Sequence, residues 1–476
     1  MKRILFLSLL IFCLATFFSG FNGTTYYIGA DVTDDYASWT AMQVAVQEVA
    51  GDTVSFRKGE TFREQVTVPN SGTSENVITY TAHGEGANPI INGADLITGW
   101  TTVPTNLIDP DASTNESGTY GWIVYQHNTI ENDNKTLKIT YIDNPEGAIW
   151  QFKDSKDLWR DLETGHTYNF SIDAKVNEGS SVTMKIYDNV SVVTVATITN
   201  TEFEAKTHQF TAGANPLDCW VLFNGMGDGE ICWVDNGYLE EDGRSSDIWQ
   251  ATLATEPGMV FFDGTCGNIQ GALVDVDSEF DWFWEANVLY VYYEEDPDGA
   301  VDIEASVRDF CIDTNSQDYI VIERLKLKHG ISANVLLDGA NQTDLNYCIS
   351  VDGVDGVEMD TAASKVQNCV IYGCTNGIDV DAAGCIKNTI IRSCTDDLEE
   401  TGANIQKTTN NIEDDSDADP LMTDPTNGDF TLQFGSPCIN RGAHVGLFVD
   451  FLGLPVPIGH CPDIGAYEHK NGGRIF

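Results

Sequence analysis

Two consecutive segments, Asn368–Asp379 (NCVIYGCTNGID) and Asn388–Glu399 (NTIIRSCTDDLE), decide the fold. At an offset of 20 their apolar positions superpose throughout, and a further offset of 21 places Cys348 under Cys369. A looser copy of the pattern lies at Leu325–Gly330. A period near 20 that contains only short strands and turns indicates a solenoid in which each rung stacks on the next. We therefore predict an all-β chain with a right-handed, single-stranded parallel β-helix.

The repeat also predicts which side chains are neighbours, because strands of adjacent rungs lie about 4.8 Å apart. Ile378 and Val380 should point inward, and the carboxylates that alternate with them should point outward. Three outward columns follow: Glu358 with Asp379 and Glu399; Asp360 with Asp381; and Asp355 with Asn376 and Asp396, beside which Asp397 lies.

Crowded carboxylates repel one another, so these columns should bind a cation or retain protons with raised pKa values. Oxygen ligands suit Ca²⁺, for which we expect Glu358, Asp360, Asp379 and Glu399 as ligands. The rung spacing is also near the ~5–5.5 Å that separates the two carboxylates of a retaining glycosidase, so Asp379, Asp381, Asp396 and Asp397 are candidate acids and bases. The alternative is a merely solvated acidic face.

A second group of candidates is basic. Arg324, Lys326 and Lys328 alternate with leucines and should project outward together, with His329 next to them. A lyase that abstracts a proton beside a uronate carboxylate needs such a base and a cation to offset the enolate charge. We take Lys328 and His329 as catalytic candidates and Arg324 as a substrate-binding candidate. A solvated strand face is the alternative.

The composition argues against two classes of partner. The 476 residues carry 73 Asp and Glu against 25 Lys and Arg, a formal charge of −48, with 42% apolar residues. The chain should fold, but its charge repels nucleic acid and anionic membrane surfaces, so neither is an expected partner. No stretch after the leader reaches the ~18 apolar residues of a membrane span.

The chain opens with the pattern of a secretory signal peptide. Met1–Arg3 is basic, Ile4–Phe18 is apolar, and small polar residues follow, so we predict a signal peptide at residues 1–23 and a secreted protein. Of the 12 cysteines, Cys13 lies in this leader, which leaves an odd number. Cys219 with Cys232, and Cys438 with Cys461, are either disulfides or buried thiols.

Three regions follow the leader. Residues 24–102 contain a helix over Trp39–Val49 and short strands, which predicts a cap and the first rungs. Residues 103–244 contain longer alternating strands such as Leu137–Tyr141 and Val182–Tyr187, which predict an antiparallel sandwich. Residues 245–476 should form the remaining rungs and a C-terminal cap.

Short motifs at both ends resemble the pectate-lyase-like right-handed β-helix superfamily: Gly51–Val54, Gly59–Glu64, Asn70–Thr73 and Pro89–Gly93, then Gly435–Gly442 and Asp463–Glu468. The resemblance implies polysaccharide lyase, hydrolase or epimerase activity. In that family the strand with the Gly-Ile-Asp pattern lines the substrate groove, and polygalacturonases carry Asn-Thr-Asp-Gly-Ile-Asp there. This chain has Cys374–Asp379 and then Asp396–Asp397, with Asn376 in place of the catalytic Asp. We therefore take Asn376 as a substrate-binding candidate.

Residues 103–244 resemble the carbohydrate-binding β-sandwich (jelly-roll) modules of xylanases, through Leu162–Ser171 and Trp233–Asn236. The resemblance implies a glycan-binding module inserted between early and later rungs. Aromatic rings stack on sugar faces, and Trp150 and Trp159, which polar residues surround, are the preferred candidates. Trp233, in an alternating strand, should be core.

The sequence supports two functions. The first is a secreted polysaccharide lyase or glycoside hydrolase that acts in an acidic groove on the β-helix, with a sandwich that holds the polysaccharide. The second is a non-catalytic adhesion or glycan-binding surface protein that uses the β-helix as a scaffold. The missing Gly-His-Gly and Arg-Ile-Lys motifs favour the second, and the groove position of the acidic columns favours the first. The oligomeric state stays open.

Overall fold

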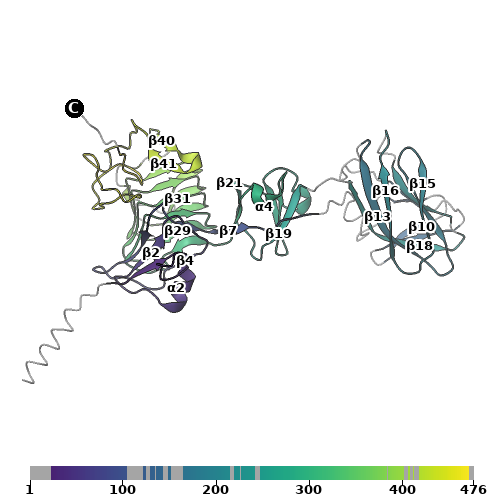
Figure 1. Cartoon of the computed structure of the whole chain (residues 1–476), viewed down its shortest axis with the longest axis horizontal. Coiled ribbons are helices and arrows are strands. Elements are labelled where there is room, and N and C mark those ends of the chain that lie inside the picture. The colour runs from purple at the N-terminus through teal and green to yellow at the C-terminus, as the bar shows by residue number, and fades with distance from the viewer. Residues whose placement is uncertain are drawn as a thin grey trace, which may run out of the picture. The chain divides into compact units, whose positions relative to one another are not determined.

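The structure is a computed structural model that describes residues 23–103, 122–124, 129–133, 136–142, 148–151, 164–214, 219–225, 227–241, 247–382, 384–400, 406–407, 411 and 418–470. The predicted signal peptide, apart from Gly23, lies outside these residues. The chain divides into two compact units, one of residues Met1–Trp100 and Ala251–Phe476 and the other of Thr101–Gln250 (Figure 1). We call the first the solenoid unit and the second the insert.

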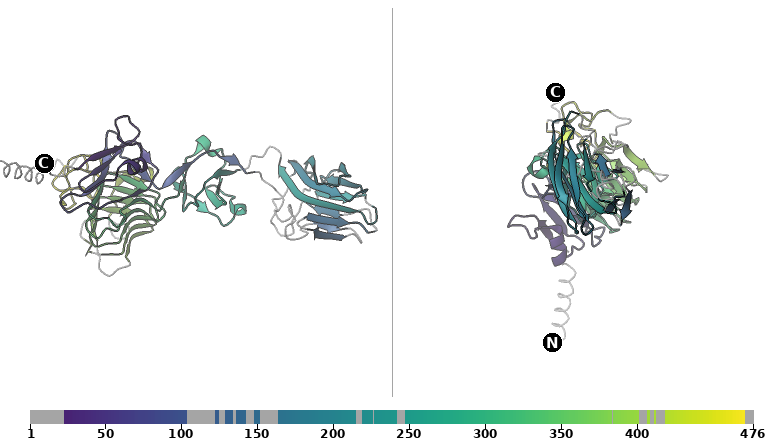
Figure 2. Two further views of the ribbon diagram at one scale, coloured as in Figure 1. Left: turned by 90° about the horizontal axis from the view of Figure 1, so that it is seen from below. Right: turned by 90° about the vertical axis from the view of Figure 1, so that its right-hand side faces the viewer.

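The solenoid unit contains three parallel sheets whose strands stack rung upon rung (Figure 2). The first sheet has the order β1 (Thr25–Ile28), β2 (Thr53–Arg57), β5 (Ile78–His83), β27 (Ile320–Glu323), β30 (Thr343–Asn346), β33 (Ser364–Gln367), β36 (Cys385–Lys387) and β39 (Gln406–Lys407). The second has the order β3 (Thr61–Phe62), β6 (Ile90–Asn92), β28 (Lys326–Lys328), β31 (Ile349–Val351), β34 (Val370–Tyr372) and β37 (Ile390–Arg392). The third has the order β4 (Val66–Thr67), β26 (Phe310–Asp313), β29 (Ala333–Leu337), β32 (Asp355–Met359), β35 (Asn376–Val380) and β38 (Asp396–Glu400).

The predicted register is confirmed. Val370 pairs with Ile390 on the second sheet, and Ile378 pairs with Val357 and Leu398 on the third. Val357 and Ile378 are fully buried and belong to one core that runs along the solenoid. Because each rung repeats the same inward positions, the core is a stack of aliphatic layers.

Asparagines set the tight turn between the first and second sheets. Asn368 and Asn388 both adopt a left-handed backbone with φ of 52°, which asparagine tolerates better than most residues. The Asn388 amide nitrogen donates to the Asn368 side-chain oxygen at 3.1 Å and to the Ala443 carbonyl at 2.9 Å. The two turns are thereby stacked and tied to the C-terminal segment.

The cap helix α2 spans Trp39–Ala45 and is four residues shorter than predicted. Its N-cap Ser38 accepts a hydrogen bond from the Ala41 N–H at 3.1 Å. It ends where Val46 becomes extended, at φ −155°, so the predicted last turn is not helical. Trp39 and Met42 face the core.

Residues that we predicted as further rungs instead form antiparallel hairpins. The sheet β21 (Thr265–Cys266), β20 (Val260–Phe262), β25 (Ile303–Ser306) and β7 (Ala94–Ile97) is antiparallel throughout. So is the pair β23 (Asp281–Glu285) and β24 (Val288–Tyr292), against which β22 (Asn268–Ile269) pairs in parallel. Short helices η2 (Leu273–Asp275) and α4 (Pro297–Ala300) lie between these strands.

Two-residue turns explain the difference. Asp263 and Gly264 have φ of 47° and 82°, and Ala286 and Asn287 have φ of 51° and 67°. Two consecutive positive φ values are the signature of the type I′ turn, which joins antiparallel strands. Asp-Gly is a strong sequence signal for this turn, so the first hairpin was predictable and the second, with Ala-Asn, was not.

The C-terminal segment covers part of the second sheet. Strands β40 (Met422–Asp424) and β41 (Asp429–Leu432) flank η3 (Pro425–Asn427), and Met422, Phe430 and Leu432 pack on Ile349, Val370 and Ile390. The outward positions that this segment covers are mostly apolar, whereas β28 at the end of the covered area carries two lysines.

The insert is a sandwich of two antiparallel sheets. One has the order β10 (Thr129–Asp133), β11 (Thr136–Thr140), β18 (Ile231–Glu241), β13 (Thr167–Val176) and β16 (Glu204–Thr211). The other has the order β15 (Val192–Ile198), β14 (Val182–Tyr187), β17 (Trp220–Asn224), β12 (Ala148–Gln151) and β9 (Trp122–Val124). Alternate residues, such as Phe170 and Ile172, form its own core. Strand β8 (Thr101–Thr102) pairs with β19 (Ile248–Thr252), so the chain enters and leaves the insert side by side.

Neither disulfide considered from the sequence is present. Cys232, Cys438 and Cys461 are free thiols, and burial raises the pKa of Cys232 well above its usual value. Within the described residues, no helix combines the length and the apolar character needed to cross a membrane.

Candidate functional site

The acidic columns lie on the third sheet in the predicted register. Glu358 pairs with Asp379 and Asp379 with Glu399, while Asp355 pairs with Asn376 and Asn376 with Asp396. Glu358, Asp379 and Glu399 are half-buried, and Asp360, Asp381 and Asp396 are exposed.

Asn376 is a bridge between carboxylates. Its amide nitrogen donates to Asp355 Oδ1 at 2.8 Å and to Glu399 Oε2 at 2.6 Å. Both of its donors thus serve the acidic columns, and the substrate-binding role that we predicted for it would have to displace these bonds.

Burial, and then the charges of stacked neighbours, raise the pKa values of these acids. Burial, followed by the charges of Asp360, Asp355 and Asp379, raises the pKa of Glu358 to about 7. Burial and the charges of Asp355, Asp381 and Glu399 raise the pKa of Asp379 to about 6. Carboxyls of this kind carry protons near neutral pH and can act as general acids.

The predicted calcium site at the columns stays a prediction. Within the described residues, no group of three or more His, Cys, Asp or Glu side chains is placed to hold a metal ion. Of the four predicted ligands, Glu358, Asp379 and Glu399 occupy the same position on paired strands, and Asp360 follows on the rung of Glu358.

Asp397 departs from the prediction. It occupies the position of Gly377 one rung earlier, and its residue exposure is only 8%. Its neighbour Asp396 takes the outward position and is exposed. The inward alternation of the strand therefore removes Asp397 from any face that a polymer could contact.

A cavity of about 470 Å³ lies on the second sheet, where β28 emerges from the C-terminal cover. Its floor contains Lys326, Lys328 and Tyr372, and the turns Asp263–Gly264 and Pro425–Gly428 form its sides. Three segments that are distant in the chain thus converge on it. We call it the lysine cavity.

Lys328 is ion-paired at one end of this cavity. Its Nζ lies 2.7 Å from Glu304 Oε2, and Glu304 Oε1 also contacts Arg63 Nη1 at 2.5 Å and accepts from Asn92 Nδ2 at 2.8 Å. Burial opposes the ionisation of Glu304, but the charge of Lys328 and its partners outweighs burial and lowers the pKa of Glu304 to about 2.

Two residues of the predicted basic group, His329 and Arg324, have surroundings that differ from the outward strand face that we expected. His329 is buried and stacked on Phe261 with ring centroids 3.8 Å apart, and burial lowers its pKa to about 3, so it is a neutral wall residue. Arg324 lies in the turn before β28, where its Nη2 donates to Thr81 Oγ1 at 2.8 Å and contacts Glu323. The left-handed backbones of both residues, with φ of 68° and 58°, break the strand alternation on which the prediction rested.

Lys326 and Asp352 are the perturbed pair of the lysine cavity. Burial and then the charge of Lys328 lower the pKa of Lys326, and burial raises the pKa of Asp352 to about 6, against the attraction of Lys326. Sequence reasoning missed Asp352 and Tyr372. Asp352 follows β31, which pairs with β28, and Tyr372 ends β34, which pairs with β31, so the repeat could have revealed both positions.

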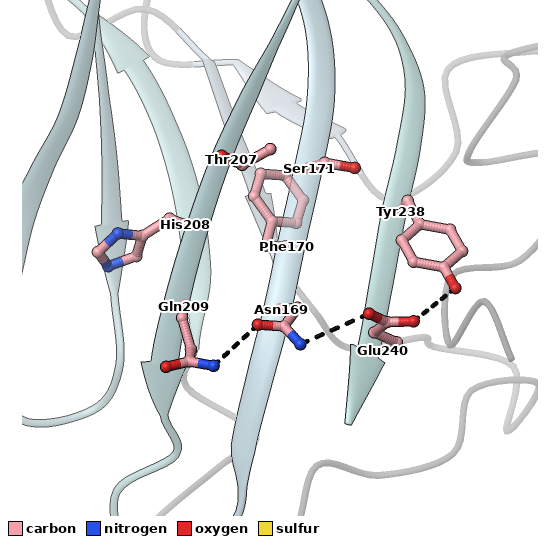
Figure 3. A pocket seen from close by; sticks show the side chains of 8 residues that line it. All are labelled: Asn169, Phe170, Ser171, Thr207, His208, Gln209, Tyr238 and Glu240. Carbon is pink, nitrogen blue, oxygen red and sulfur yellow. Dashed lines mark hydrogen bonds between the residues drawn. The ribbon is translucent and has the colours of Figure 1, made fainter. Parts of the chain in front are cut away.

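The insert has a third candidate site on its β16–β13–β18 sheet (Figure 3). The register places Gln209, Asn169 and Glu240 in one row across the three strands, and Thr207, Ser171 and Tyr238 in the next. We call the side that carries these six residues the polar face. An open cavity of about 540 Å³ lies along it.

Hydrogen bonds connect the first row. Gln209 Nε2 donates to Asn169 Oδ1 at 3.0 Å, Asn169 Nδ2 donates to Glu240 Oε1 at 3.5 Å, and the Tyr238 hydroxyl donates to Glu240 Oε2 at 2.7 Å (Figure 3). The side chains are thereby oriented before any ligand arrives. The sequence signal was the alternating Thr167–Ser171 stretch, whose polar positions we did not single out.

The predicted tryptophans are only partly placed. Trp159 lies outside the described residues, and for Trp150 the structure describes the backbone alone, which pairs with Val221 and Trp122. Trp233 is not core as predicted. It is half-buried on the outer side of β18, where Lys175 Nζ lies 5.5 Å from its ring centroid and its Nε1 donates to Asp133 Oδ2 at 3.1 Å.

Together these features define an all-β protein, a parallel β-solenoid with an inserted antiparallel sandwich. No family model and no curated protein matches the chain. Among solved structures, it is similar to XylC in complex with xylose, at 12% identity and a TM-score of 0.40 over 78% of this chain and 54% of that one. The chain thus spans about half of the XylC chain.

Two further structures are similar to a smaller part of this chain. The CBM22-1 xylan-binding domain of Paenibacillus barcinonensis Xyn10C is 11% identical, with a TM-score of 0.24 over 30% of this chain and 99% of that one. The CBM22-1–GH10 modules of Clostridium thermocellum xylanase 10B with xylohexaose are 14% identical, with a TM-score of 0.24 over 30% and 29%.

Proposed function

We propose that this protein is a secreted polysaccharide-binding protein and that the polymer lies along the polar face of the insert. The observation that carries the proposal is the chain of hydrogen bonds from Gln209 through Asn169 and Glu240 to Tyr238, along an open cavity. Amides and carboxylates supply the donors and acceptors that sugar hydroxyls need, and the Tyr238 ring offers an apolar surface to a pyranose. The apolar leader supports an extracellular location.

Isothermal titration of the whole chain with soluble neutral and uronate polymers, xylan among them, tests the proposal. We expect at least one neutral polymer to bind, and the double variant Asn169→Ala with Gln209→Ala to weaken that binding about tenfold or more, since two hydrogen-bonding side chains are lost. Thr194→Ala, an exposed change on β15 of the other sheet, is the matched control. The proposal fails if no polymer binds, or if the control weakens binding as much as the double variant.

Polysaccharide cleavage at the acidic columns is the second candidate. It is favoured by the raised pKa values of Glu358 and Asp379, about 7 and about 6, on rungs that pair directly. At neutral pH one carboxyl can be protonated while its neighbour is ionised, which is the division of labour that glycosidic cleavage requires. Asp381 and Asp396 flank the pair.

The assay follows reducing ends and the ultraviolet absorbance of unsaturated uronates, with and without a chelator. Reducing ends alone indicate hydrolysis, an absorbance rise indicates elimination, and Glu358→Gln or Asp379→Asn should lower either rate at least a hundredfold. Glu256→Gln, at an exposed position, should change nothing. If the wild-type protein leaves every polymer intact but still binds one, the protein is the non-catalytic surface protein.

A further inference from the structure

The lysine cavity contains a cation that the protein itself does not neutralise. Among the described residues, Lys138, Lys206, Lys328 and Lys365 have carboxylate oxygens within 2.7–3.1 Å of Nζ. Lys326 has no such ion pair in that part of the chain, although its side chain is half-buried and lines the cavity. Other described lysines, such as Lys58 and Lys185, also lack an ion pair, and Lys326 differs from them in that it lines a cavity.

The cavity wall comes close to the Lys326 side chain. Val351 and Phe430 line the cavity beside it, and a Cβ added to Gly428 would lie 3.4 Å from the Lys326 ammonium nitrogen. The Gly428 backbone is left-handed, at φ 79°, so the turn that forms this wall requires glycine and comes close to the cation. The cavity volume of about 470 Å³ falls within the range that encloses small ligands.

The rest of the lining suits a hydroxylated ligand. Thr265, Thr426 and Asn427 supply polar side chains, and Tyr372 supplies a ring that packs on Phe430 with centroids 5.3 Å apart. Asp352 lines the same cavity. A protonated Asp352 would donate a hydrogen bond to an incoming carboxylate, whereas an ionised one would repel it.

We propose that the lysine cavity binds the carboxylate of an acidic sugar, with Lys326 as its counter-ion. This inference deepens the proposed function by naming a class of sugar, and it rests on that function only in that the ligand is a saccharide. It assigns a second site, on the second sheet of the solenoid unit, separate in sequence from the polar face of the insert.

The charged and titratable groups around Asp352 fix how binding should depend on pH. They are Lys326 and Lys328 on β28, Glu304 on β25, Cys266 on β21, and Asp263 and Tyr372 in the cavity wall. Burial leaves His329 neutral above a pKa of about 3, so it does not titrate in the working range. Uronate affinity should therefore rise as the pH falls from 7.5 to 5.5, because Asp352 takes up its proton near pH 6.

The test is isothermal titration of the full chain with a trigalacturonate, a neutral oligosaccharide and succinate. We expect trigalacturonate to bind, succinate to bind at least tenfold more weakly, and Lys326→Met to weaken trigalacturonate binding about tenfold or more. Lys365→Met, which removes a lysine paired with Asp344 on the first sheet, is the matched control and should bind as the wild type does. Lys326→Arg retains the charge and should recover part of the affinity.

Neutral oligosaccharide binding separates this inference from the proposed function. Lys326→Met should leave it unchanged, and the polar-face double variant should reduce it. The inference is overturned if wild-type protein does not bind trigalacturonate, if succinate binds equally well, or if Lys326→Met binds trigalacturonate as tightly as Lys365→Met does. A melting temperature equal to that of the wild type shows that each variant is folded.

Discussion

Glu358 shows what a repeat does to a single carboxyl group. The same backbone position carries an acid in the next two rungs, Asp379 and Glu399, so the charges stack at the rung spacing. Burial and these like charges raise the pKa of Glu358 to about 7. The columns therefore store electrostatic repulsion that grows as the pH rises.

Because of this repulsion, we expect Glu358→Gln to raise the melting temperature by an amount that depends on pH. Because the folded pKa lies above the unfolded one, the native protonated form contributes stability that is complete below about pH 4.5 and is lost as the pH rises through about 7. Asp355, Asp360, Asp379 and Asp381 face the same group. The variant should therefore melt higher than the wild type at pH 8 and equal to it at pH 4.5.

The measurement is thermal unfolding of both proteins from pH 4.5 to 8.5. Glu256→Gln, a substitution at an exposed position, is the control. Its melting temperature should differ from that of the wild type by the same amount at every pH. If the melting temperatures of the wild type and of Glu358→Gln differ by the same amount at pH 4.5 and at pH 8.5, the raised pKa of Glu358 is contradicted.

From the sequence, the neighbours of single residues could be predicted better than the directions of their side chains. The columns of Glu358 and Asp355 follow from periodicity alone, and the structure confirms them. His329 and Arg324 could not be predicted, because left-handed backbone at each removes the two-residue alternation. Glu304 belongs to a distant hairpin and pairs with Lys328, a contact that the sequence alone does not reveal.

At the level of elements, turns help the strands to hold adjacent rungs together. Asn388 combines a left-handed backbone with three side-chain bonds, to Asn368, to the Ala443 carbonyl and from the Ala443 N–H at 2.8 Å. Asn388→Ala should lower the free energy of unfolding by about 2–4 kcal/mol, because the backbone becomes strained and buried polar groups lose their partners. Asn388→Gly removes only the bonds and should cost about half as much.

Denaturant unfolding followed by circular dichroism measures both variants. Equal losses for alanine and glycine would show that the backbone conformation contributes nothing. A loss below 0.5 kcal/mol for alanine, the scale of ordinary surface changes, would contradict the asparagine ladder as a support of the rungs.

The aliphatic layers predict a large loss of stability when an inward side chain is shortened. Ile378 is fully buried on β35 between Val357 and Leu398 of the adjacent rungs. Ile378→Ala should cost about 2–5 kcal/mol, because the rigid strands cannot close on the space that is left. Exposed Asp381→Ala on the same rung should stay within about 0.5 kcal/mol in the same unfolding experiment. Equal costs would contradict the inward assignment.

Elements were predictable where their signal was local. The strand Val182–Tyr187 was predicted to the residue, and the cap helix at the right place but too long. The hairpins of β20 to β25 were mistaken for rungs, because short apolar strands look alike whether their partners are parallel or antiparallel.

The core of the rungs and the core of the insert share no buried residues. One runs through the rungs, and the other fills the sandwich of the insert. Replacement of residues 103–247 by a short Gly-Ser linker should preserve solenoid folding, because β8 and β19 lie side by side. Calorimetry of the full chain should then show two transitions, and the shortened chain should retain one of them within about 2 °C. Loss of both transitions would contradict independent cores.

Net charge is also a property of the whole chain. At −48 the folded protein repels itself, and salt screens that repulsion over about 10 Å at 0.1 M. The melting temperature should rise by several degrees between 20 mM and 1 M sodium chloride. A flat or falling melting temperature would show that the acidic surface is already compensated.

Hydrogen–deuterium exchange of the full chain with a bound oligosaccharide shows whether the polymer lies on the polar face. A neutral oligosaccharide identified by titration should slow exchange in peptides that cover residues 167–171, 207–209 and 238–240, the strands of the polar face. Peptides of β14 and β15, in the other sheet of the insert, should exchange as before. Protection confined to β14 and β15, or to the solenoid unit, would contradict polymer binding at the polar face.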